Sequence, residues 1–264
     1  MALPVGLYKR YRSSGRSPRT ESPPLGREPG QALGATVALV RPLAVIALAV
    51  TCLWAGTWIA TPTTLGIRAG VSRLDRLHHT RPLTPDQVPQ YLGEAVIAVE
   101  DQNFYQDHGI NVQGLARAAL YDLAHHCTCQ GGSTLTEQLA EDLYLNGSDS
   151  SIWGRWVDII LALKITDHLT KPQILDAYLS QVYLGDGAVG AAQASRSYFH
   201  QPLGKDNLAQ LALLAGLPQA PTLLDPFTNP EGARERRAEV LSAMVGLHYI
   251  SRQQARQANA QPVP

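Results

Sequence analysis

An uncharged apolar stretch near the start of the chain is the feature that most restricts how this protein can fold. It runs through residues 42–62, PLAVIALAVTCLWAGTWIATP, and has no charged side chain between residues 43 and 60. This length is near the lower end of what a helix needs to cross the hydrocarbon core of a bilayer. Trp54 and Trp58 fall toward one end of the stretch, where interfacial aromatic side chains usually lie. We therefore predict a transmembrane signal anchor over residues 42–61.

The charge before the apolar stretch predicts an orientation. Residues 1–41 carry seven basic and two acidic side chains, a net charge of +5, although the 264-residue chain as a whole is neutral. Excess Lys and Arg on one side of a first membrane helix favours the cytoplasm for that side. We expect a cytoplasmic N-terminus, with the rest of the chain on the other side of the cell membrane. A neutral chain has no overall field that would attract nucleic acid, so no nucleic-acid partner is predicted.

Two other interpretations of the apolar stretch stay open at this stage. A cleaved signal peptide normally has a shorter basic region and a small-residue cleavage motif, and neither is clear in this sequence. A helix buried in the core of a soluble domain would be equally apolar.

Composition and spacing divide the chain into five parts. Residues 1–41 are rich in Arg, Ser, Pro and Gly, which is typical of a disordered tail. After the predicted anchor, residues 62–83 are interpreted as a polar stem. Residues 84–250 are predicted to form one domain, and residues 251–264 a C-terminal helix and tail.

Repeated helix-start signals predict that the domain is mainly α. Threonine followed three residues later by Glu or Gln forms a capping box, and asparagine is a favoured N-cap. The capping boxes begin at Thr84, Thr134 and Thr170, and the asparagine caps are Asn111 and Asn229. The stretch WVDIILALKITDHL is apolar over most of its helical surface, so we expect a buried core helix there. No stretch shows the sustained alternation of a strand.

Two adjacent acids are the first candidates for chemistry. Glu100 and Asp101 stand where the apolar run VIAVEDQNFY ends. A carboxyl group in that position can be partly desolvated, which raises its pKa toward a value useful for a general base. On the local sequence alone, a solvated acidic helix end explains the same two residues.

The order of several motifs resembles a known family. The motifs are EDQNFYQDHG, QGGSTLTEQLAEDLYL, GRWVDIILALK, KPQILDAYLSQVYLGDGAVG and AAQASRSYFHQPL. Together they cover roughly residues 80–250 and resemble the family 51 glycosyltransferase domain. This is the peptidoglycan-polymerising domain of bifunctional penicillin-binding proteins and of monofunctional transglycosylases. Its patterns E-D-x-x-F-x-x-H-x-G and G-G-S-T-x-T-x-Q are specific; the second is complete here and the first nearly so.

The resemblance implies a fold, a reaction and a set of partners. The fold would be mainly α and lysozyme-like, with a cleft near the membrane surface. The enzyme would join lipid II to a growing lipid-linked glycan and release undecaprenyl pyrophosphate. The acceptor 4-hydroxyl would attack the donor anomeric carbon and invert it. A divalent metal ion, Mg or Mn, is implied as a cofactor at the donor pyrophosphate, and other cell-wall synthesis proteins are implied as partners.

The resemblance also assigns roles to residues. Glu100 matches the general base, and Asp158 falls where the family has a second glutamate, near the donor pyrophosphate and its metal ion. Both are therefore predicted as catalytic residues, and Asp158 also as a metal ligand. The residues predicted to bind substrate are Asp101, Phe104, His108, Gly109, Arg117, Gly132, Ser133, Thr134, Gln138 and Arg155; all match family positions except His108, which stands one residue after the family histidine position. The glycine turn before Thr134 is expected to present unpaired N–H groups of a helix start to the leaving pyrophosphate.

The sequence departs from the family pattern at charged positions. Glu141 stands where the family has a lysine that helps to hold the donor phosphates, and Asp158 is one methylene shorter than the family glutamate. Asp107 occupies the family histidine position, with His108 next to it. Asp176 stands where a glutamate is common. An acid near a leaving pyrophosphate repels it, which opposes the transition state.

Three hypotheses about function follow from these motifs. The first is an active peptidoglycan glycosyltransferase with altered donor contacts. The second is a weak or inactive homologue that binds lipid-linked glycan or a cell-wall assembly partner. The third is a lytic glycan-cleaving enzyme in which Glu100 acts as an acid.

A second type of site was considered at residues 125–129, HHCTC. Cys127 and Cys129 are separated by one residue, which is neither the usual zinc spacing nor ordinary disulfide geometry. The resemblance instead makes this segment a variable loop before the second motif, so we do not predict a metal there.

Overall fold

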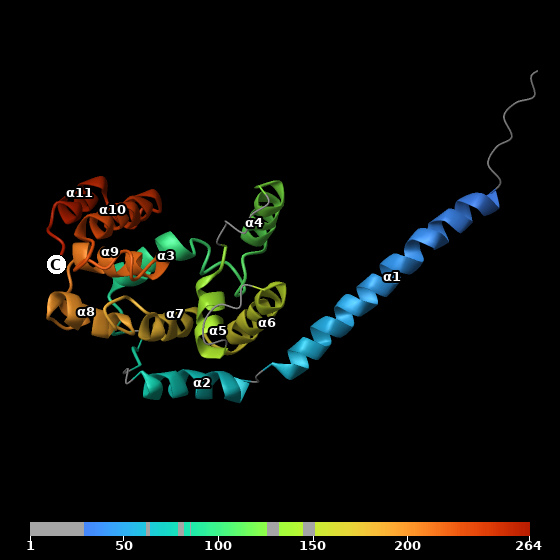
Figure 1. Ribbon diagram of the computed structural model, residues 1–264, viewed down its shortest axis with the longest axis horizontal. Helices are drawn as coiled ribbons and strands as arrows, with labels where there is room; N and C mark the ends of the chain where they lie inside the picture. The colour runs from blue at the N-terminus through green and yellow to red at the C-terminus, as the bar shows by residue number, and fades with distance from the viewer. Residues whose placement is uncertain (1–28, 62–63, 79–81, 85, 126–131, 145–150) are drawn as a thin grey trace, which may run out of the picture. The chain divides into compact units, whose positions relative to one another are not determined.

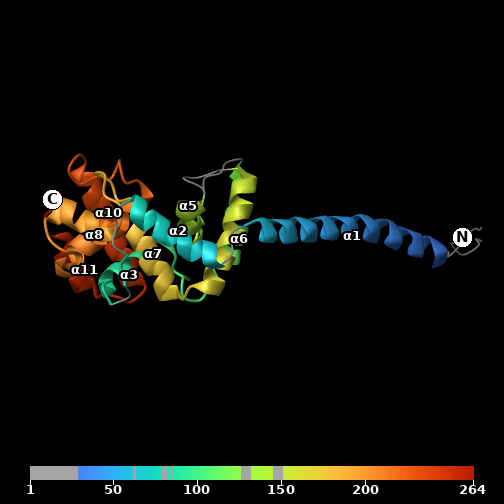
Figure 2. The same cartoon turned by 90° about the horizontal axis from the view of Figure 1, so that it is seen from below.

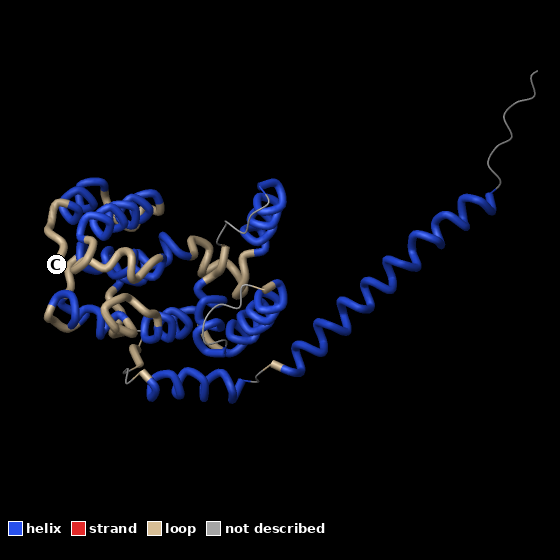
Figure 3. Tube along the Cα trace, viewed as in Figure 1, coloured by secondary structure: helices blue, strands red, loops and turns tan. Residues whose placement is uncertain are grey.

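The computed structural model describes residues 29–264, apart from 62–63, 79–81, 85, 126–131 and 145–150. The chain divides into two compact units, residues 1–53 and residues 54–264. The described residues form helices and loops and no named strand, as Figure 3 shows. An isolated antiparallel bridge between Tyr183 and Val189 is the only extended pairing recorded among them. The predicted mainly α fold is confirmed.

The first helix contains the predicted membrane stretch. Helix α1 spans Pro29–Ala60, so it begins well before the predicted anchor. Its segment Arg41–Ala60 is the one helix in the described part of the chain that is long and apolar enough to cross a membrane. Only 6% of that segment is buried. Because so little of it is covered by protein, the alternative of a buried core helix does not fit.

The second unit contains the remaining helices. In chain order they are α2 (Thr64–Leu77), α3 (Gln90–Glu100), α4 (Val112–His125), α5 (Leu135–Tyr144), α6 (Ile152–His168), α7 (Lys171–Gln181), α8 (Ala191–Phe199), α9 (Leu208–Gly216), α10 (Pro230–Gly246) and α11 (Arg252–Asn259). Two single-turn 3-10 helices, η1 (Leu203–Lys205) and η2 (Leu217–Gln219), flank α9.

These helices pack as two groups that share one core (Figures 1 and 2). The C-terminal group consists of α3, α8, α9, α10 and α11, with α9 packed against the other four. The central group consists of α2, α5, α6 and α7, with α5 packed against the other three. Contact between α7 and α8 joins the two groups. Helix α4 makes no extensive contact with another helix within the described residues.

The predicted helix caps are confirmed at four positions. The Gly114 amide donates to Asn111 Oδ1 at 2.7 Å, and the Gly232 amide donates to Asn229 Oδ1 at 3.0 Å. At the two internal capping boxes, the Thr134 and Thr170 amides donate to the side chains of the Glu or Gln three residues later, at 2.8 and 3.0 Å. These bonds satisfy backbone donors that a helix start leaves without an intrahelical partner.

The helix start predicted at Thr84 is wrong. Thr84 and Gln87 do bond to each other, but they form a turn, and α3 begins only at Gln90. Pro89 stands at the N-cap of α3 with φ of −58° and ψ of 132°. A proline disfavours helical backbone at the residue before it, here Val88, so the helix cannot run through from Thr84.

The segment predicted as a polar stem contains a helix. Helix α2 packs against α5, α6 and α7. Its Ile67 and Leu74, seven residues apart and therefore on one helical face, are 0% and 5% exposed. This segment thus contributes apolar side chains to the core that holds the central group together.

Candidate functional site

A cavity of about 840 Å³ lies where the two helix groups meet. Its wall is formed by the end of α3, the start of α4, the turn before α5, the first turns of α5, η2 and α10. The structure brings seven of the predicted site residues together in this wall. They are Glu100, Asp101, Arg117, Gly132, Ser133, Thr134 and Gln138.

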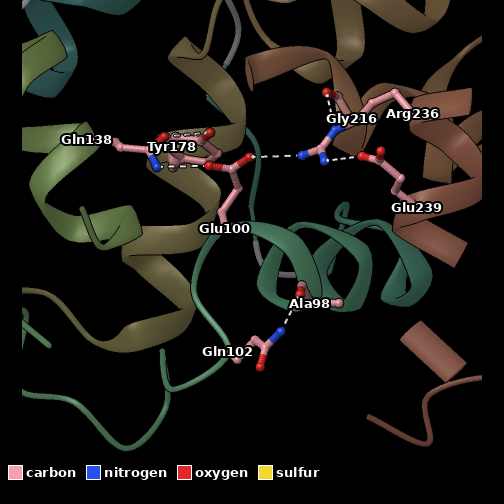
Figure 4. A network of polar contacts seen from close by, with 8 residues as sticks. All are labelled: Ala98, Glu100, Gln102, Gln138, Tyr178, Gly216, Arg236 and Glu239. Carbon is pink, nitrogen blue, oxygen red and sulfur yellow. Dashed lines mark hydrogen bonds and ion pairs between the residues drawn. The ribbon is translucent and has the colours of Figure 1, made fainter. Parts of the chain in front are cut away.

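Glu100 is the last residue of α3, and its carboxylate is held from two sides (Figure 4). Gln138 Nε2 donates to Glu100 Oε2 at 3.0 Å. Arg236 Nη2 lies 3.9 Å from Glu100 Oε1. The Glu100 side chain is only 14% exposed. A carboxylate restrained in this way keeps one orientation at the cavity wall, as a general base requires.

A buried tyrosine orients the glutamine. The Tyr178 hydroxyl donates to Gln138 Oε1 at 3.0 Å, so the Gln138 amide bridges Tyr178 and Glu100 (Figure 4). Tyr178 is 1% exposed, and burial raises its pKa well above the ordinary value. The hydroxyl therefore stays protonated and keeps donating, which leaves the amide nitrogen of Gln138 directed at the carboxylate.

Arg236 reaches the cavity from α10, far from the sequence motifs. Its Nε donates to the Gly216 carbonyl at 3.2 Å, and its Nη1 pairs with Glu239 at 2.8 Å. These contacts fix the guanidinium beside Glu100. Neither Arg236 nor Tyr178 was predicted as a site residue. Arg236 lies in a stretch of mixed charge after the last matched motif, and Tyr178 lies within a matched motif, where its spacing does not reveal its contact with Gln138.

The start of α5 is occupied by the protein's own acceptors. The Leu135 amide donates to Asp101 Oδ2 at 3.2 Å, and the Glu137 amide donates to Thr134 Oγ1 at 3.1 Å. The Thr134 amide donates to Glu137 Oε2, and the Thr134 hydroxyl donates to the Gly109 carbonyl at 2.7 Å. The prediction that unpaired amides at this helix start bind a phosphate is therefore wrong for the N–H groups of Thr134, Leu135 and Glu137. Two acids of the same protein already meet the positive end of the helix.

Asp101 combines a structural bond with an unusual acidity. Its side chain lines the cavity, yet the residue is only 6% exposed. Burial raises the pKa of Asp101 to about 6, although the bond from the Leu135 amide and the charge of Lys171 oppose the shift. With a pKa of about 6, the Asp101 carboxyl that accepts from the Leu135 amide changes charge around pH 6.

Five predicted site residues lie outside the described cavity wall. Phe104 is fully buried in the core, and Gly109 holds a left-handed turn with φ of +85°, which glycine adopts without steric cost. His108 is exposed and pairs with Asp167 at 3.0 Å. Arg155 donates from Nη1 to Ser133 Oγ at 2.7 Å, and so it contacts a residue of the wall without lining the cavity itself. Asp158 is buried, at 5% exposed.

The described residues do not provide a ready metal site. Among them, no three His, Cys, Asp or Glu side chains converge on one point, and this includes the surroundings of Asp158. In the HHCTC stretch, His126, Cys127 and Cys129 lie outside the described residues. His125 stacks on Tyr121, with ring centroids 4.0 Å apart.

The charges that line the cavity are mixed. Three carboxylates, of Glu100, Asp101 and Glu141, face two guanidinium groups, of Arg117 and Arg236. Glu141 does line the cavity, so its charge acts on whatever binds there. The two arginines are the described cationic groups that an anionic ligand would meet.

Sequence comparison matches this chain to transglycosylases. The family model described as Transglycosylase matches residues 69–245. A protein of Cupriavidus necator strain H16 that is named as a transglycosylase is 38% identical over 213 residues. The match covers 79% of this chain and 91% of that protein.

Longer proteins match over part of their length. Penicillin-binding protein 1A of Neisseria flavescens is 40% identical over 173 residues, which is 66% of this chain and 22% of that protein. The same protein of Neisseria gonorrhoeae is 40% identical over 170 residues, 64% of this chain and 21% of its own length. The crystal structure of penicillin-binding protein 1A from Haemophilus influenzae aligns with a TM-score of 0.40 and 22% identity. It covers 70% of this chain and 18% of that one.

Proposed function

This chain belongs to the transglycosylase family, and from that premise we propose that it polymerises lipid II into glycan strands and releases undecaprenyl pyrophosphate. The observation that carries the proposal is the Glu100 carboxylate, held at the cavity wall by Gln138 and Arg236. A sugar hydroxyl is a poor nucleophile and needs a positioned base. Glu100 would take the proton of the acceptor 4-hydroxyl as that oxygen attacks the donor anomeric carbon.

The pyrophosphate leaving group requires positive charge or hydrogen-bond donors elsewhere in the cavity. A departing pyrophosphate develops negative charge, which cationic or N–H donor groups stabilise. Because the amides of Thr134, Leu135 and Glu137 are already bonded, we assign this role first to the two arginines of the wall. Arg117 would contact the pyrophosphate directly. Arg236 would hold Glu100 and contribute positive charge to the same cavity.

A divalent metal ion would be bound together with the substrate pyrophosphate. Magnesium is commonly held by one or two carboxylates together with substrate phosphates. The described residues contain no cluster of three acidic, His or Cys ligands, so Mg²⁺ or Mn²⁺ would depend on the pyrophosphate for part of its coordination. No step of the proposed reaction is assigned to it.

The proposal includes a place in the cell. The N-terminus would lie in the cytoplasm and the α-helical domain outside it, with α1 as a single membrane span. The charge of +5 before the span and the apolar segment Arg41–Ala60 support this orientation. A membrane-held enzyme would meet a substrate that is itself attached to a membrane lipid.

The direct test uses labelled lipid II in vesicles with the full-length protein and a divalent ion. We expect polymer that a muramidase digests, and a loss of at least about 100-fold in rate for Glu100→Gln, because a general base supplies about that much. Glu94→Gln is the matched control: it lies on the same helix but outside the cavity wall, and should keep full activity. Equal activity in the two variants, or cleavage of preformed glycan, would contradict the proposal.

The position of Glu141 favours a second candidate function. In it, the chain is a weak or inactive homologue that binds lipid-linked glycan without polymerising it. Its carboxylate lines the cavity in which the family resemblance has a phosphate-binding lysine. In that case lipid II would bind without forming polymer, and Glu141→Lys would raise activity. Asp142→Lys changes the charge equally one position away, outside the described wall, and should not.

A further inference from the structure

A second, smaller pocket of about 180 Å³ lies between the first two turns of α3 and those of α7. This α3–α7 pocket shares no lining residue with the larger cavity. Glu94, which lines it, and Glu100 point about 120° apart around α3, because each residue turns a helix by about 100°. The α3–α7 pocket is therefore separate from the cavity that contains Glu100.

Part of the pocket lining is apolar. Ile97 of α3 and Leu175 of α7 are 3% and 6% exposed, and both line the pocket. The two helices approach closely here, since a methyl group at Gly93 would lie 3.2 Å from Leu175 Cδ2. An alkyl chain in the pocket would pack against these side chains, as the stems of long charged side chains pack on apolar surface.

The carboxylate of Asp176 lines the same pocket and is buried without a partner. Asp176 is only 6% exposed, and its side chain makes no hydrogen bond or ion pair with the described residues. Burial raises the pKa of Asp176 to about 6, and the charge of Asp86 adds to the shift. Buried acids are rarely left unpaired, because removing a charge from water is costly. A cation from outside the described residues would complement this carboxylate.

A second acid and an aromatic ring complete the pocket. Glu94 Oε1 accepts a hydrogen bond from Gln90 Nε2 at 2.8 Å, so Glu94 is partly satisfied and mainly adds negative charge. The Tyr105 ring meets the buried Phe104 edge to face, with centroids 5.2 Å apart. Burial raises the pKa of the Tyr105 hydroxyl, and the charges of Asp176 and Glu94 contribute, so the three groups lie near one another. An aromatic face beside carboxylates attracts an organic cation.

We propose that the α3–α7 pocket binds a primary alkylammonium group, with the ammonium at the Asp176 carboxylate and the Tyr105 ring and the alkyl chain on the apolar lining. An ammonium donates charge-assisted hydrogen bonds to a carboxylate and is attracted to an aromatic face. No three acidic, His or Cys side chains of the described residues converge here, so a metal ion would lack protein ligands. The ligand is a lysine side chain of another chain or a free alkylamine. The site does not depend on the proposed polymerisation.

Calorimetric titration of the full-length protein in detergent, at neutral pH, tests the site with n-butylammonium and with a blocked glycine–lysine–glycine peptide. We expect binding, and we expect Asp176→Asn to weaken it by at least about 10-fold, because hydrogen bonds to charged groups contribute that much. Tyr105→Leu should weaken it by about 3-fold through the loss of the ring. Tighter binding of the peptide than of n-butylammonium assigns the site to a lysine of a partner chain; otherwise the ligand is a free amine.

The matched control is Asp186→Asn, which changes an exposed acid outside the pocket and should bind n-butylammonium like the parent. If Asp176→Asn loses helical content in circular dichroism, Tyr105→Leu carries the comparison, since Tyr105 is 60% exposed. The proposal is overturned if the parent binds neither probe, or if the pocket variants bind like Asp186→Asn. Equally tight binding of uncharged n-butanol also overturns it, because apolar contact and not charge would then select the ligand.

Discussion

At the scale of single residues, the arrangement around Glu100 explains how one carboxylate is kept in place. One oxygen accepts a hydrogen bond from Gln138 of α5, and the other forms an ion pair with Arg236 of α10. Gln138 is itself fixed by Tyr178 of α7. The position of the carboxylate therefore depends on both helix groups, and a change in any of these three side chains should act on Glu100.

The first prediction concerns Tyr178→Phe. Without the hydroxyl, Gln138 Oε1 loses its donor and the amide is free to turn away from Glu100. Because a net hydrogen bond is worth about 1 kcal/mol, we expect the polymerisation rate to fall by about 2- to 10-fold with little change in KM. Tyr198→Phe is the control: its hydroxyl is also buried, donating to the Leu184 carbonyl at 2.9 Å, but it lies away from Glu100. Equal rates in the two variants would contradict the role of Tyr178.

The second prediction concerns Asp101 and pH. Burial raises the pKa of this carboxyl from 3.8 to about 6, so the folded state binds its proton more tightly than the unfolded state. The resulting stability is present below about pH 4 and is lost as pH rises through about 6. Asp101→Asn removes this titration, and the free energy of unfolding should fall less between pH 4 and pH 6 than in the parent. The free energies of unfolding of both proteins are measured by urea titration at several pH values. If the two change with pH in parallel, the pKa assigned to Asp101 is contradicted.

At the scale of elements, helix starts were the most predictable features. A cap depends on residues within three positions of each other, so Asn111, Thr134, Thr170 and Asn229 could be identified from the sequence. The helix start predicted at Thr84 was wrong for an equally local reason, because Pro89 prevents the helix from beginning before Gln90. Helix α2 was missed because the few apolar residues that face the core stand among polar ones.

The third prediction concerns the start of α5. Thr134 caps this helix and also donates to the Gly109 carbonyl, so it links the turn to the loop after α3. Thr134→Ala should lower the free energy of unfolding by about 2–3 kcal/mol, combining the lost cap with an unsatisfied buried carbonyl. It should also reduce activity, because Ser133 and Gln138 would shift in the cavity wall. Chemical unfolding and the lipid II assay measure the two effects.

Thr170 provides the comparison for that variant. It begins α7 with the same box, the Thr170 amide donating to Gln173 at 3.0 Å, but it is exposed. Thr170→Ala should cost about 1 kcal/mol and leave activity unchanged. If both threonine variants lost activity alike, the link to Gly109 would not be specific.

At the scale of the whole molecule, the neighbouring residues Arg236 and Arg237 of α10 contact different parts of the chain. Arg236 points into the cavity, whereas Arg237 is 1% exposed and donates to the carbonyls of Asn259, Gln261 and Pro262. Arg237 thereby holds the C-terminal segment against α10. The core of the C-terminal group extends to α11 for this reason.

The fourth prediction tests that link. Arg237→Met keeps much of the side-chain volume but leaves three carbonyls without their donor, and should cost about 3 kcal/mol in free energy of unfolding. The exposed Arg234→Met should cost less than about 0.5 kcal/mol. Urea unfolding of the detergent-purified chain compares them, and equal stabilities would contradict a structural role for Arg237.

What the sequence determined by itself was local: the apolar stretch of α1, most helix caps, the mainly α fold, and the motif residues Glu100 and Gln138. Periodicity and capping act over a few residues, so they can be read along the chain. Tertiary structure alone decided that Tyr178 and Arg236 meet at this carboxylate. It also decided that Asp101 accepts a hydrogen bond from the Leu135 amide, 34 residues away, so that this amide is already bonded within the protein. Those contacts depend on how whole helices pack, which no short pattern encodes.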